Sequence, residues 1–236
     1  PRTTVFRLLA TLESLGFVQR AADGRSYRLG MAVLRLGFEY LASLELTQLG
    51  QPLLAGLCDT LRVPCNLVIR DGRQIVYVAK VSPPTPLSSS VTVGTRLPAH
   101  ATVLGRVLLE DLTLSELRAL YPEDTLEPFS ASTPRTVRAL FDLVQADRAR
   151  GVVSGEGFFE ASISTVAAPV RDHSGRVVAA LGVTIASPQI APERADELQL
   201  QVRAAADALS RLLNYAPAHA IGGAQVLPMR RPRGRR

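Results

Sequence analysis

The chain contains few of the residues that support disulfide, metal or redox chemistry. Its 236 residues include two cysteines, three histidines and a single lysine. Two cysteines are too few for a disulfide framework, so we expect Cys58 and Cys65 to be buried apolar residues in a reducing compartment. The sequence also lacks an apolar run of the roughly 18 residues needed to span a bilayer, and no charged-then-apolar leader opens it. These absences favour a cytoplasmic protein with no membrane segment.

Motifs of common enzyme classes are missing as well. There is no G-x-S-x-G elbow, no H-E-x-x-H, no Walker loop and no C-x-x-C pair. The one conceivable nucleophile pair joins Cys65 and His100, and a thiol that opens a buried strand is typically inert. Glu156 and Glu160 are interpreted as lid or rim residues rather than an acid-base pair. We therefore expect no catalysis, no cofactor and no metal ion, with a hydrolytic enzyme as the least favoured alternative.

The positive charge is almost entirely arginine, because Lys80 is the only lysine. Six arginines lie between Pro1 and Arg35 against only Glu13 and Asp23, whereas the long middle of the chain is mildly acidic. Cationic residues gathered at one end suit the neutralisation of nucleic-acid phosphates, and arginine forks also suit guanine. The charge distribution therefore predicts a nucleic-acid-binding N-terminal end.

The first thirty residues predict a helix followed by a two-stranded hairpin. Gly16 is placed to end the helix, and two short strand-like runs flank Asp23-Gly24, a frequent hairpin turn. A helix followed at once by a small wing is typical of a winged helix-turn-helix, whose helix enters the major groove. The alternative is a basic helix and hairpin that never touch DNA. The helical spacing rests on Val5, Leu8, Leu9, Leu12 and Leu15.

The remainder of the chain predicts an α+β domain with one central antiparallel sheet. Hairpins are expected at residues 66–81, around Asp71-Gly72, and at 162–186, with a brief strand at 91–94. Helices are expected at about 31–43, from near Pro52, from about Thr102, at 112–122 and at 192–214. A further helix is expected to be capped by Ser132 or Thr133, with Pro134 in its first turn and Gly151 as its stop.

Several stretches occur in the order and spacing of one known family. They are PRTTVFRLLATLESLGFVQR with YRLG, GRQIVYVAKV, VGTRLPAHATVLGRVLL, and STVAAPVRDHSGRVVAALGVT. Through them, residues 1–215 resemble IclR-family transcriptional regulators, in which a winged helix-turn-helix is joined by a linker helix to a GAF-like effector domain. The third stretch is similar to the branch that controls protocatechuate and 4-hydroxybenzoate catabolism. The implied divisions are a truncated winged helix-turn-helix (1–29), a linker helix (30–45), a GAF-like effector-binding domain (46–215) and a disordered basic tail (216–236).

The resemblance implies a ligand-responsive DNA-binding regulator that senses a small organic acid, aromatic in the nearest branch. Its implied partners are operator DNA, that acid, and further copies of the chain in a homodimer or tetramer. The linker helix is either the seam between copies, which we favour, or packs within its own chain. His100 is either a donor to a carboxylate or a structural turn residue, and Arg96 and Arg106 are either counter-charges or members of ion pairs. The implied DNA-binding residues are Arg2, Thr3, Thr4, Arg7 and Arg25. The implied effector-binding residues are His100, Thr102, Val103, Leu104, Thr165, Gly182 and Thr184.

The sequence departs from the family pattern before the Ala-Pro pair of its last quoted stretch. Ser162 stands where glycine is usual, and Thr165 stands where a cysteine or serine often sits. The identity of the effector is therefore left open. The arginines of the tail belong either to a solvated terminus or to a segment attracted non-specifically to DNA.

Family members carry two helices upstream of the position of Pro1, and those helices support the reading helix. Because the sequence given lacks them, we expect its N-terminal segment to be distorted and to bind operator DNA weakly. Tight, sequence-specific gel-shift binding to a natural operator by this chain would contradict that expectation. The rival interpretation, a stand-alone small-molecule sensor, is tested by adding the upstream residues and asking whether DNA binding returns.

Overall fold

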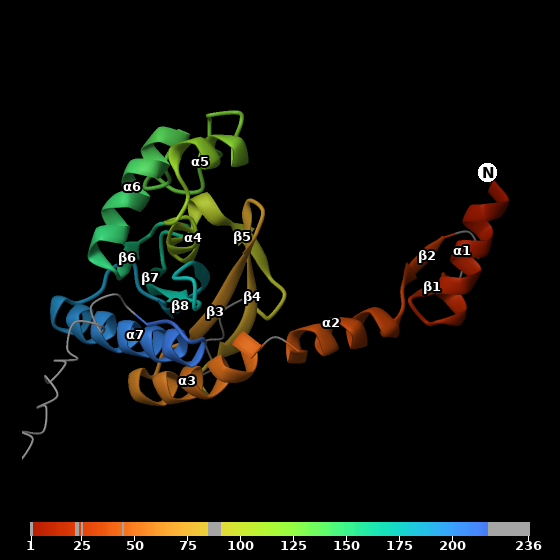
Figure 1. Cartoon of the computed structure of the whole chain (residues 1–236), viewed down its shortest axis with the longest axis horizontal. Helices are drawn as coiled ribbons and strands as arrows, with labels where there is room; N and C mark the ends of the chain where they lie inside the picture. Colours follow the sequence, from red (N-terminus) through yellow and green to blue (C-terminus); the bar gives the residue numbers. More distant parts are fainter. Residues whose placement is uncertain (1, 22–23, 25, 44, 85–90, 217–236) are drawn as a thin grey trace, which may run out of the picture.

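The computed structural model describes residues 2–216 except 22–23, 25, 44 and 85–90. Figure 1 shows a small N-terminal unit joined by one helix to a larger body. The small unit contains α1 (Arg2–Ser14), β1 (Val18–Arg20) and β2 (Tyr27–Leu29), and the joining helix is α2 (Met31–Ser43). The expectations for the basic tail beyond residue 216 and for Arg25 fall outside the described residues.

Glycines shape the small unit at the end of α1. Gly16 has φ +76°, and the next residue, Phe17, donates its N–H to the carbonyl of Leu12 at 2.9 Å, which closes the last turn. β1 pairs antiparallel with β2 in a register that places Val18 opposite Leu29. A Cβ on Gly30 would lie 2.0 Å from the carbonyl oxygen of Gly16, so only glycine permits α2 to begin there. The predicted helix, hairpin and linker helix are confirmed.

The larger body is built on a six-stranded sheet in the order β5-β4-β3-β8-β7-β6, with every neighbouring pair antiparallel. This confirms the predicted central antiparallel sheet. The strands are β3 (Cys65–Asp71), β4 (Gln74–Val81), β5 (Arg96–Pro98), β6 (Val153–Glu156), β7 (Ser164–Arg171) and β8 (Val177–Ile185).

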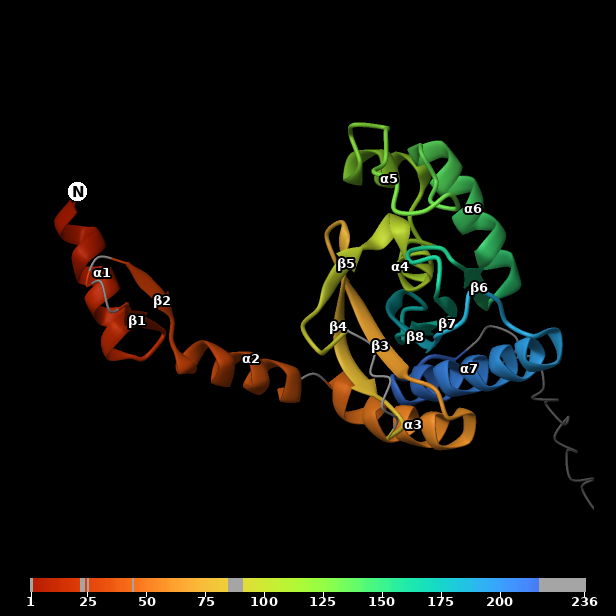
Figure 2. The same cartoon turned by 180° about the vertical axis from the view of Figure 1, so that it is seen from behind.

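Helices cover both faces of this sheet, as Figures 1 and 2 show from opposite sides. α3 (Glu45–Leu61) and α7 (Pro192–Leu212) lie side by side on one face. On the other face lie a 3₁₀ turn (Ala99–Ala101), α4 (Val103–Leu108), α5 (Leu114–Leu120) and α6 (Val137–Arg150). None of the helices in the described part of the chain is long and apolar enough to cross a membrane.

Alternate residues of the central strands enter two separate cores. Leu67 of β3 and Leu181 of β8 pack under α3 and α7. Val68, which follows Leu67, and Ala180, which precedes Leu181, pack under α4 and α6. Both faces are therefore buried, which explains why the strand sequences are apolar almost throughout. Cys58 and Cys65 are free thiols buried in the first core, as expected.

Three local predictions are wrong. α3 begins at Glu45, so Pro52 lies inside the helix rather than in its first turn. Residues 91–94 form no strand; Gly94 has φ +89° in a turn, and the strand β5 follows it. The cap of α6 is Thr136, whose hydroxyl accepts from the N–H of Ala139 at 3.2 Å, whereas Thr133 accepts from backbone N–H groups within its own loop.

A proline inside a helix removes one hydrogen bond and costs about 3 kcal/mol when packing does not compensate. The helix continues past Pro52 because Leu54 and Leu57 beyond it are fully or almost fully buried against the sheet. Close packing precedes it as well, since a Cβ on Gly50 would lie 2.8 Å from Leu67 Cδ2. Tertiary burial on both sides of the proline therefore decides the helix boundary.

A buried ion pair fastens α4 to α6. Arg106 Nε donates to Asp147 Oδ2 at 2.7 Å, and the two side chains are 4% and 0% exposed. We predict that Asp147→Ala lowers the free energy of unfolding by about 3–5 kcal/mol, because it leaves a guanidinium buried without its partner. Asp142→Ala is the matched control, since it breaks the exposed i,i+4 pair with Arg138 and should cost no more than about 0.5 kcal/mol. Urea denaturation measures both, and equal losses would contradict the prediction.

Candidate functional site

A cavity of about 600 Å³ opens on the α4 face of the sheet, at the edge where β3 and β7 begin and β8 ends. The start of α4 forms one wall, and the loop between β6 and β7 covers the cavity from outside. Besides the residues discussed below, the lining includes Val63, Pro64, Pro83, Val91, Leu97, Ser162, Ile163, Ile185 and Ala186. The lining is mainly apolar, as is usual for a small-molecule site.

The sheet contributes a row of neutral polar side chains. Asn66 of β3 is 2% exposed and donates from Nδ2 to Thr184 Oγ1 of β8 at 3.0 Å. Thr165 of β7 lies directly opposite Thr184 in the strand pairing and also lines the cavity. Neighbouring strands thus present an amide and two hydroxyls to the same space, without any charge.

Tyr77 of β4 adds an unpartnered hydroxyl. Its side chain is 5% exposed and lines the cavity, yet its hydroxyl makes no hydrogen bond within the described part of the chain. Burial raises the pKa of Tyr77 to about 12, with a smaller contribution from Glu160, so the phenol stays protonated at neutral pH. The phenol therefore offers a hydrogen-bonding group to a molecule in the cavity.

Charge is confined to the mouth of the cavity. Arg62, which directly follows α3, and Glu160 are the charged residues of the lining, and both are exposed. The interior therefore offers neutral hydrogen-bonding groups and apolar walls, and Arg62 is the one basic residue of the lining in the described part of the chain. Such a site suits a small apolar molecule with polar groups at its ends and at most one negative charge, because a second buried charge would lack a partner.

The loop covering the cavity is held from two sides. Arg106 lies over the ring of Phe158 at 4.4 Å, and the carbonyl of Phe158 accepts from Ser130 Oγ at 2.6 Å. The next ring, Phe159, stacks on Phe129 at 5.2 Å between ring centroids. Glu160 belongs to this loop and lies at the rim, whereas Glu156 ends β6, accepts from a backbone N–H and does not line the cavity.

The structure brings together five of the seven residues implied for effector binding. Thr102 caps α4 by accepting from Gly105 N–H at 3.1 Å, so its hydroxyl is already engaged, and its neighbours form an apolar wall. Direct effector contact by these residues stays a prediction. The five residues that line the cavity are Thr102, Val103, Leu104, Thr165 and Thr184.

The other implied residues lie elsewhere. His100 is buried outside the lining, with Nε2 2.9 Å from the carbonyl oxygen of Glu127 and its ring against Tyr121, as the structural alternative expected. Gly182 lies in β8 beneath α4, where a Cβ would be 2.7 Å from the carbonyl oxygen of Val166. Neither residue is part of the cavity surface.

Both candidate counter-charges are engaged in ion pairs. Arg96 pairs with Asp71 on the surface, at 2.5 Å, and Arg106 pairs with Asp147 in the interior. Cys65 packs in the core beneath α3 and α7, on the opposite face of the sheet from the cavity, and His100 has other neighbours. The structure therefore offers no thiol-imidazole pair in the described residues.

Sequence reasoning missed Arg62, Asn66, Tyr77 and the strand β6. The signal for Asn66 was present, since an amide within an apolar strand is unusual unless its face is not fully packed. Tyr77 gave no such signal because tyrosine is common in strands. Only the register between strands shows that both side chains face the same space.

The N-terminal unit presents its polar and apolar residues to solvent. Thr3, Thr4 and Arg7 are exposed along α1, while the side chain of Arg2 is not described. The apolar face predicted for this helix is largely exposed too, with Val5 at 55% and Leu8 at 59%. Within the wing, Arg20 pairs with Glu13 at 3.3 Å and so ties β1 to α1.

Comparison with known proteins places this geometry in a family. The model of the bacterial transcriptional regulator IclR C-terminal domain matches residues 38–211. The Pca regulon regulatory protein of Pseudomonas putida is 36% identical over 185 residues, which are 78% of this chain and 63% of the length of that regulator. The HTH-type transcriptional regulator XynR of Escherichia coli K12 is 30% identical over 214 residues, covering 91% of this chain and 85% of that protein.

A solved structure agrees with these matches. The crystal structure of an IclR homolog from Microbacterium hydrocarbonoxydans, complexed with 4-hydroxybenzoate, has a TM-score of 0.73 and 26% identity, covering 91% of this chain and 86% of that one. The family model spans most of the chain, and the fold agrees over nearly all of it. The chain therefore belongs to the IclR family of bacterial transcriptional regulators.

Proposed function

We propose that this protein is a DNA-binding transcriptional regulator whose activity responds to a small aromatic monocarboxylic acid bound in the cavity. The observation that carries the proposal is the cavity itself, which combines a neutral polar floor and apolar walls with one cation at the mouth. The relatives named above are regulators, and one solved homologue holds 4-hydroxybenzoate. The ring of an aromatic acid suits the apolar walls of the cavity, and its carboxylate suits the cation at the mouth.

The fit follows from the chemistry of the lining. Val103, Leu104 and Phe158 provide apolar contact for a ring, while Asn66 and Tyr77 can hydrogen-bond its substituents. Arg62 is the single cation available to a carboxylate. A dicarboxylate would place two charges where one cation is available, so monocarboxylates are preferred.

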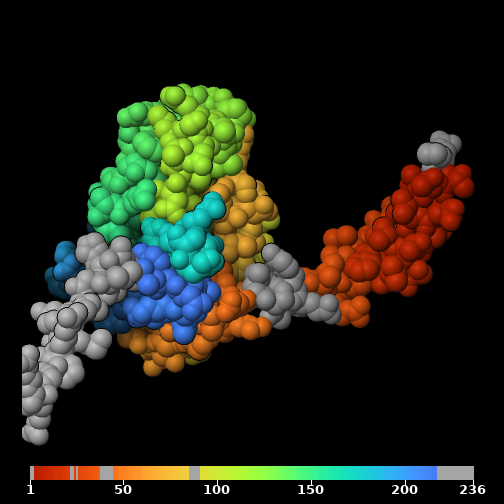
Figure 3. All heavy atoms as spheres, in the orientation of Figure 1, coloured from red at the N-terminus to blue at the C-terminus, as the bar shows by residue number. Residues whose placement is uncertain are grey.

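DNA binding is assigned to the N-terminal unit. α1 and its wing stand apart from the larger body in Figure 3, and the exposed Thr3, Thr4 and Arg7 lie along one helix. A helix of this kind reads base edges in the major groove, while arginines and hydroxyl groups bind the phosphates. The proposal therefore separates the DNA-reading and effector-binding parts of the chain.

The linker helix α2 is proposed as the seam between two copies. Its described side chains include Met31, Leu34 and Leu36, which are 71%, 51% and 56% exposed. Met31 and Leu34, three residues apart, lie on one side of the helix, and exposed apolar side chains there favour burial against a second copy. Readers of paired half-sites are usually symmetric dimers. Association through α2 would also set the distance between the two α1 helices.

The effector part of the proposal is tested by calorimetric titration with benzoate, 4-hydroxybenzoate, 3,4-dihydroxybenzoate, phthalate and succinate. We predict that 4-hydroxybenzoate binds and that Tyr77→Phe weakens its binding about tenfold, since one hydrogen bond to a charged or polar ligand group contributes about 1–1.5 kcal/mol. Tyr121→Phe is the matched control, because it removes a buried hydroxyl outside the cavity and should change affinity less than twofold. If the folded protein binds none of the five acids, the effector proposal is wrong.

The DNA part is tested with a duplex selected by the protein from a randomised pool. Arg7→Ala should weaken binding to that duplex and reduce the slope of log K against log salt by about one, because it removes one phosphate or base contact. Arg118→Ala removes an exposed arginine from α5 and should leave both quantities unchanged. If no duplex is enriched while 4-hydroxybenzoate still binds, the stand-alone sensor is the better interpretation.

A further inference from the structure

A second hollow, of about 320 Å³, lies at the far end of β7 from the first cavity. β6 pairs only with residues 164–167 of β7, so the last residues of β7 form a free edge on that side. The hollow lies along this edge, between the end of α6 and the C-terminal half of α7. It shares no lining residue with the first cavity.

Arginines dominate the lining of this hollow. Arg148 comes from α6, Arg171 from β7, and Arg203 and Arg211 from α7, two turns apart. The acidic residues of the lining are Glu110 and Asp207, and Asp111 pairs with Arg171 from outside it, so one positive charge is left in excess when all these groups are ionised. Three separate elements thus direct guanidinium groups at one space.

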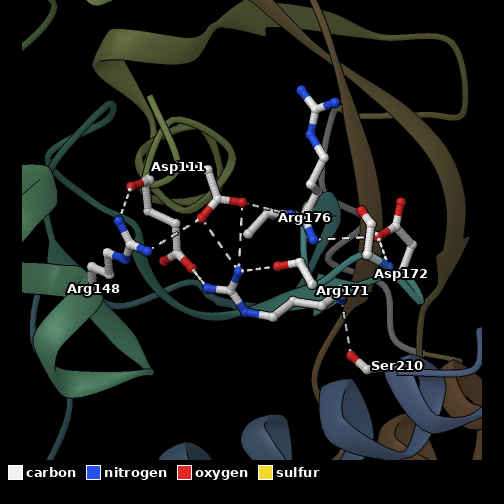
Figure 4. Close-up of polar contacts among 10 residues, drawn as sticks. Asp111, Arg148, Arg171, Asp172, Arg176 and Ser210 are labelled. Atoms are coloured by element: carbon white, nitrogen blue, oxygen red, sulfur yellow. Dashed lines mark hydrogen bonds and ion pairs between the residues drawn. The ribbon is translucent and has the colours of Figure 1, made fainter. Parts of the chain in front are cut away.

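Arg171 is the fixed member of this set, as Figure 4 shows. Its guanidinium pairs with Glu110 and Asp111 and donates to the carbonyl of Gly175 at 2.7 Å. Its backbone N–H donates to Ser210 Oγ on α7 at 3.0 Å. These contacts hold the base of the hollow in place.

The remaining arginines have donors to spare. Arg203 and Arg211 form no ion pair within the described residues, and the Arg203 guanidinium lies beside Gly151 at the end of α6. Arg148 reaches Asp111 only at 3.9 Å, and its side chain is 51% exposed. An anion could therefore bind all three without displacing a strong internal pair.

We propose that this hollow binds a phosphate group, either free or as the monoester of a small metabolite. Guanidinium forks match phosphate oxygens, and Arg148, Arg203 and Arg211 have donors available to a phosphate dianion. Burial also raises the pKa of Glu110 to about 7, against the opposing effect of Arg171, so this carboxyl repels an incoming anion less than an ordinary glutamate would. The volume admits a group larger than phosphate alone, hence the monoester.

The hollow is linked through Arg171 to α4, the helix that forms a wall of the first cavity. Glu110 and Asp111 directly follow α4 and its last turn, and both are bound by Arg171. Asp111 also accepts from the backbone N–H of Val177 at 2.7 Å, which ties this end of α4 to the start of β8. Arg171 therefore joins the lining of the hollow to the end of the helix whose start forms a wall of the first cavity.

The test is calorimetric titration of the full chain with inorganic phosphate and, separately, with glycerol 3-phosphate, in phosphate-free buffer at 0.15 M sodium chloride. We expect saturable binding of at least one probe, and which of them binds more tightly identifies the source of the phosphate group. The combined change Arg203→Ala and Arg211→Ala should weaken binding about tenfold or more, because it removes two charge-assisted contacts.

The matched control combines Arg118→Ala with Arg138→Ala, which removes the same charge from exposed positions outside the hollow. This control should bind the probe as the unchanged protein does, with thermal melting confirming that both variants are folded. The proposal is overturned if neither inorganic phosphate nor glycerol 3-phosphate binds. Equal binding by the two double variants would overturn it too, since it would show attraction to the general surface charge.

Discussion

The close approach of α4 to the sheet is the constraint on which the rest of the larger body depends. Two glycines of the sheet permit it, because a Cβ on Gly155 would lie 2.4 Å from Val103 Cγ2 and a Cβ on Gly182 would lie 2.9 Å from Leu104 Cδ2, both on α4. The buried pair of Arg106 and Asp147 then fixes α4 to α6. Gly182 therefore serves the cavity without lining it: it sets the position of the wall that Leu104 forms. A family pattern can mark such a residue as part of the site although its role is steric.

The same packing separates charge from the interior of the cavity. The first residues of α4 form an apolar wall of the cavity, and the acidic residues that follow α4 lie at its opposite end. Arg62 and Glu160 are left at the mouth, while Glu110 and Asp111 meet Arg171 at the far end of β7. Two sites of opposite chemistry result, one neutral and apolar, the other cationic, connected by a single short helix.

Local signals in the sequence predicted most of the elements. Asp71-Gly72 and the turn at 172–175 fix the two hairpins, and the periodicity of α2 and α7 fixes those helices nearly to the residue. Prediction failed where long-range packing decides, as at Pro52 inside α3 and at β6, which is a strand only because β7 lies beside it. For the cavity, motif matching placed the start of α4 and two threonines, but Asn66 and Tyr77 needed the register across β3, β4 and β8. Spacing within one segment holds no information about such contacts.

The route from the cavity to the DNA-reading end can be argued from one helix. Arg62 follows Leu61, the last residue of α3, so this end of α3 lies at the mouth of the cavity, and its other end begins two residues after α2 stops. A 17-residue helix is about 25 Å long and is stiff on that scale. If the proposed effector is held by Arg62 in one arrangement of α3 and not in another, its binding favours the first arrangement. Because only contacts that differ between the two arrangements shift their populations, the exposed Arg62 is better suited to this role than the packed floor of the cavity.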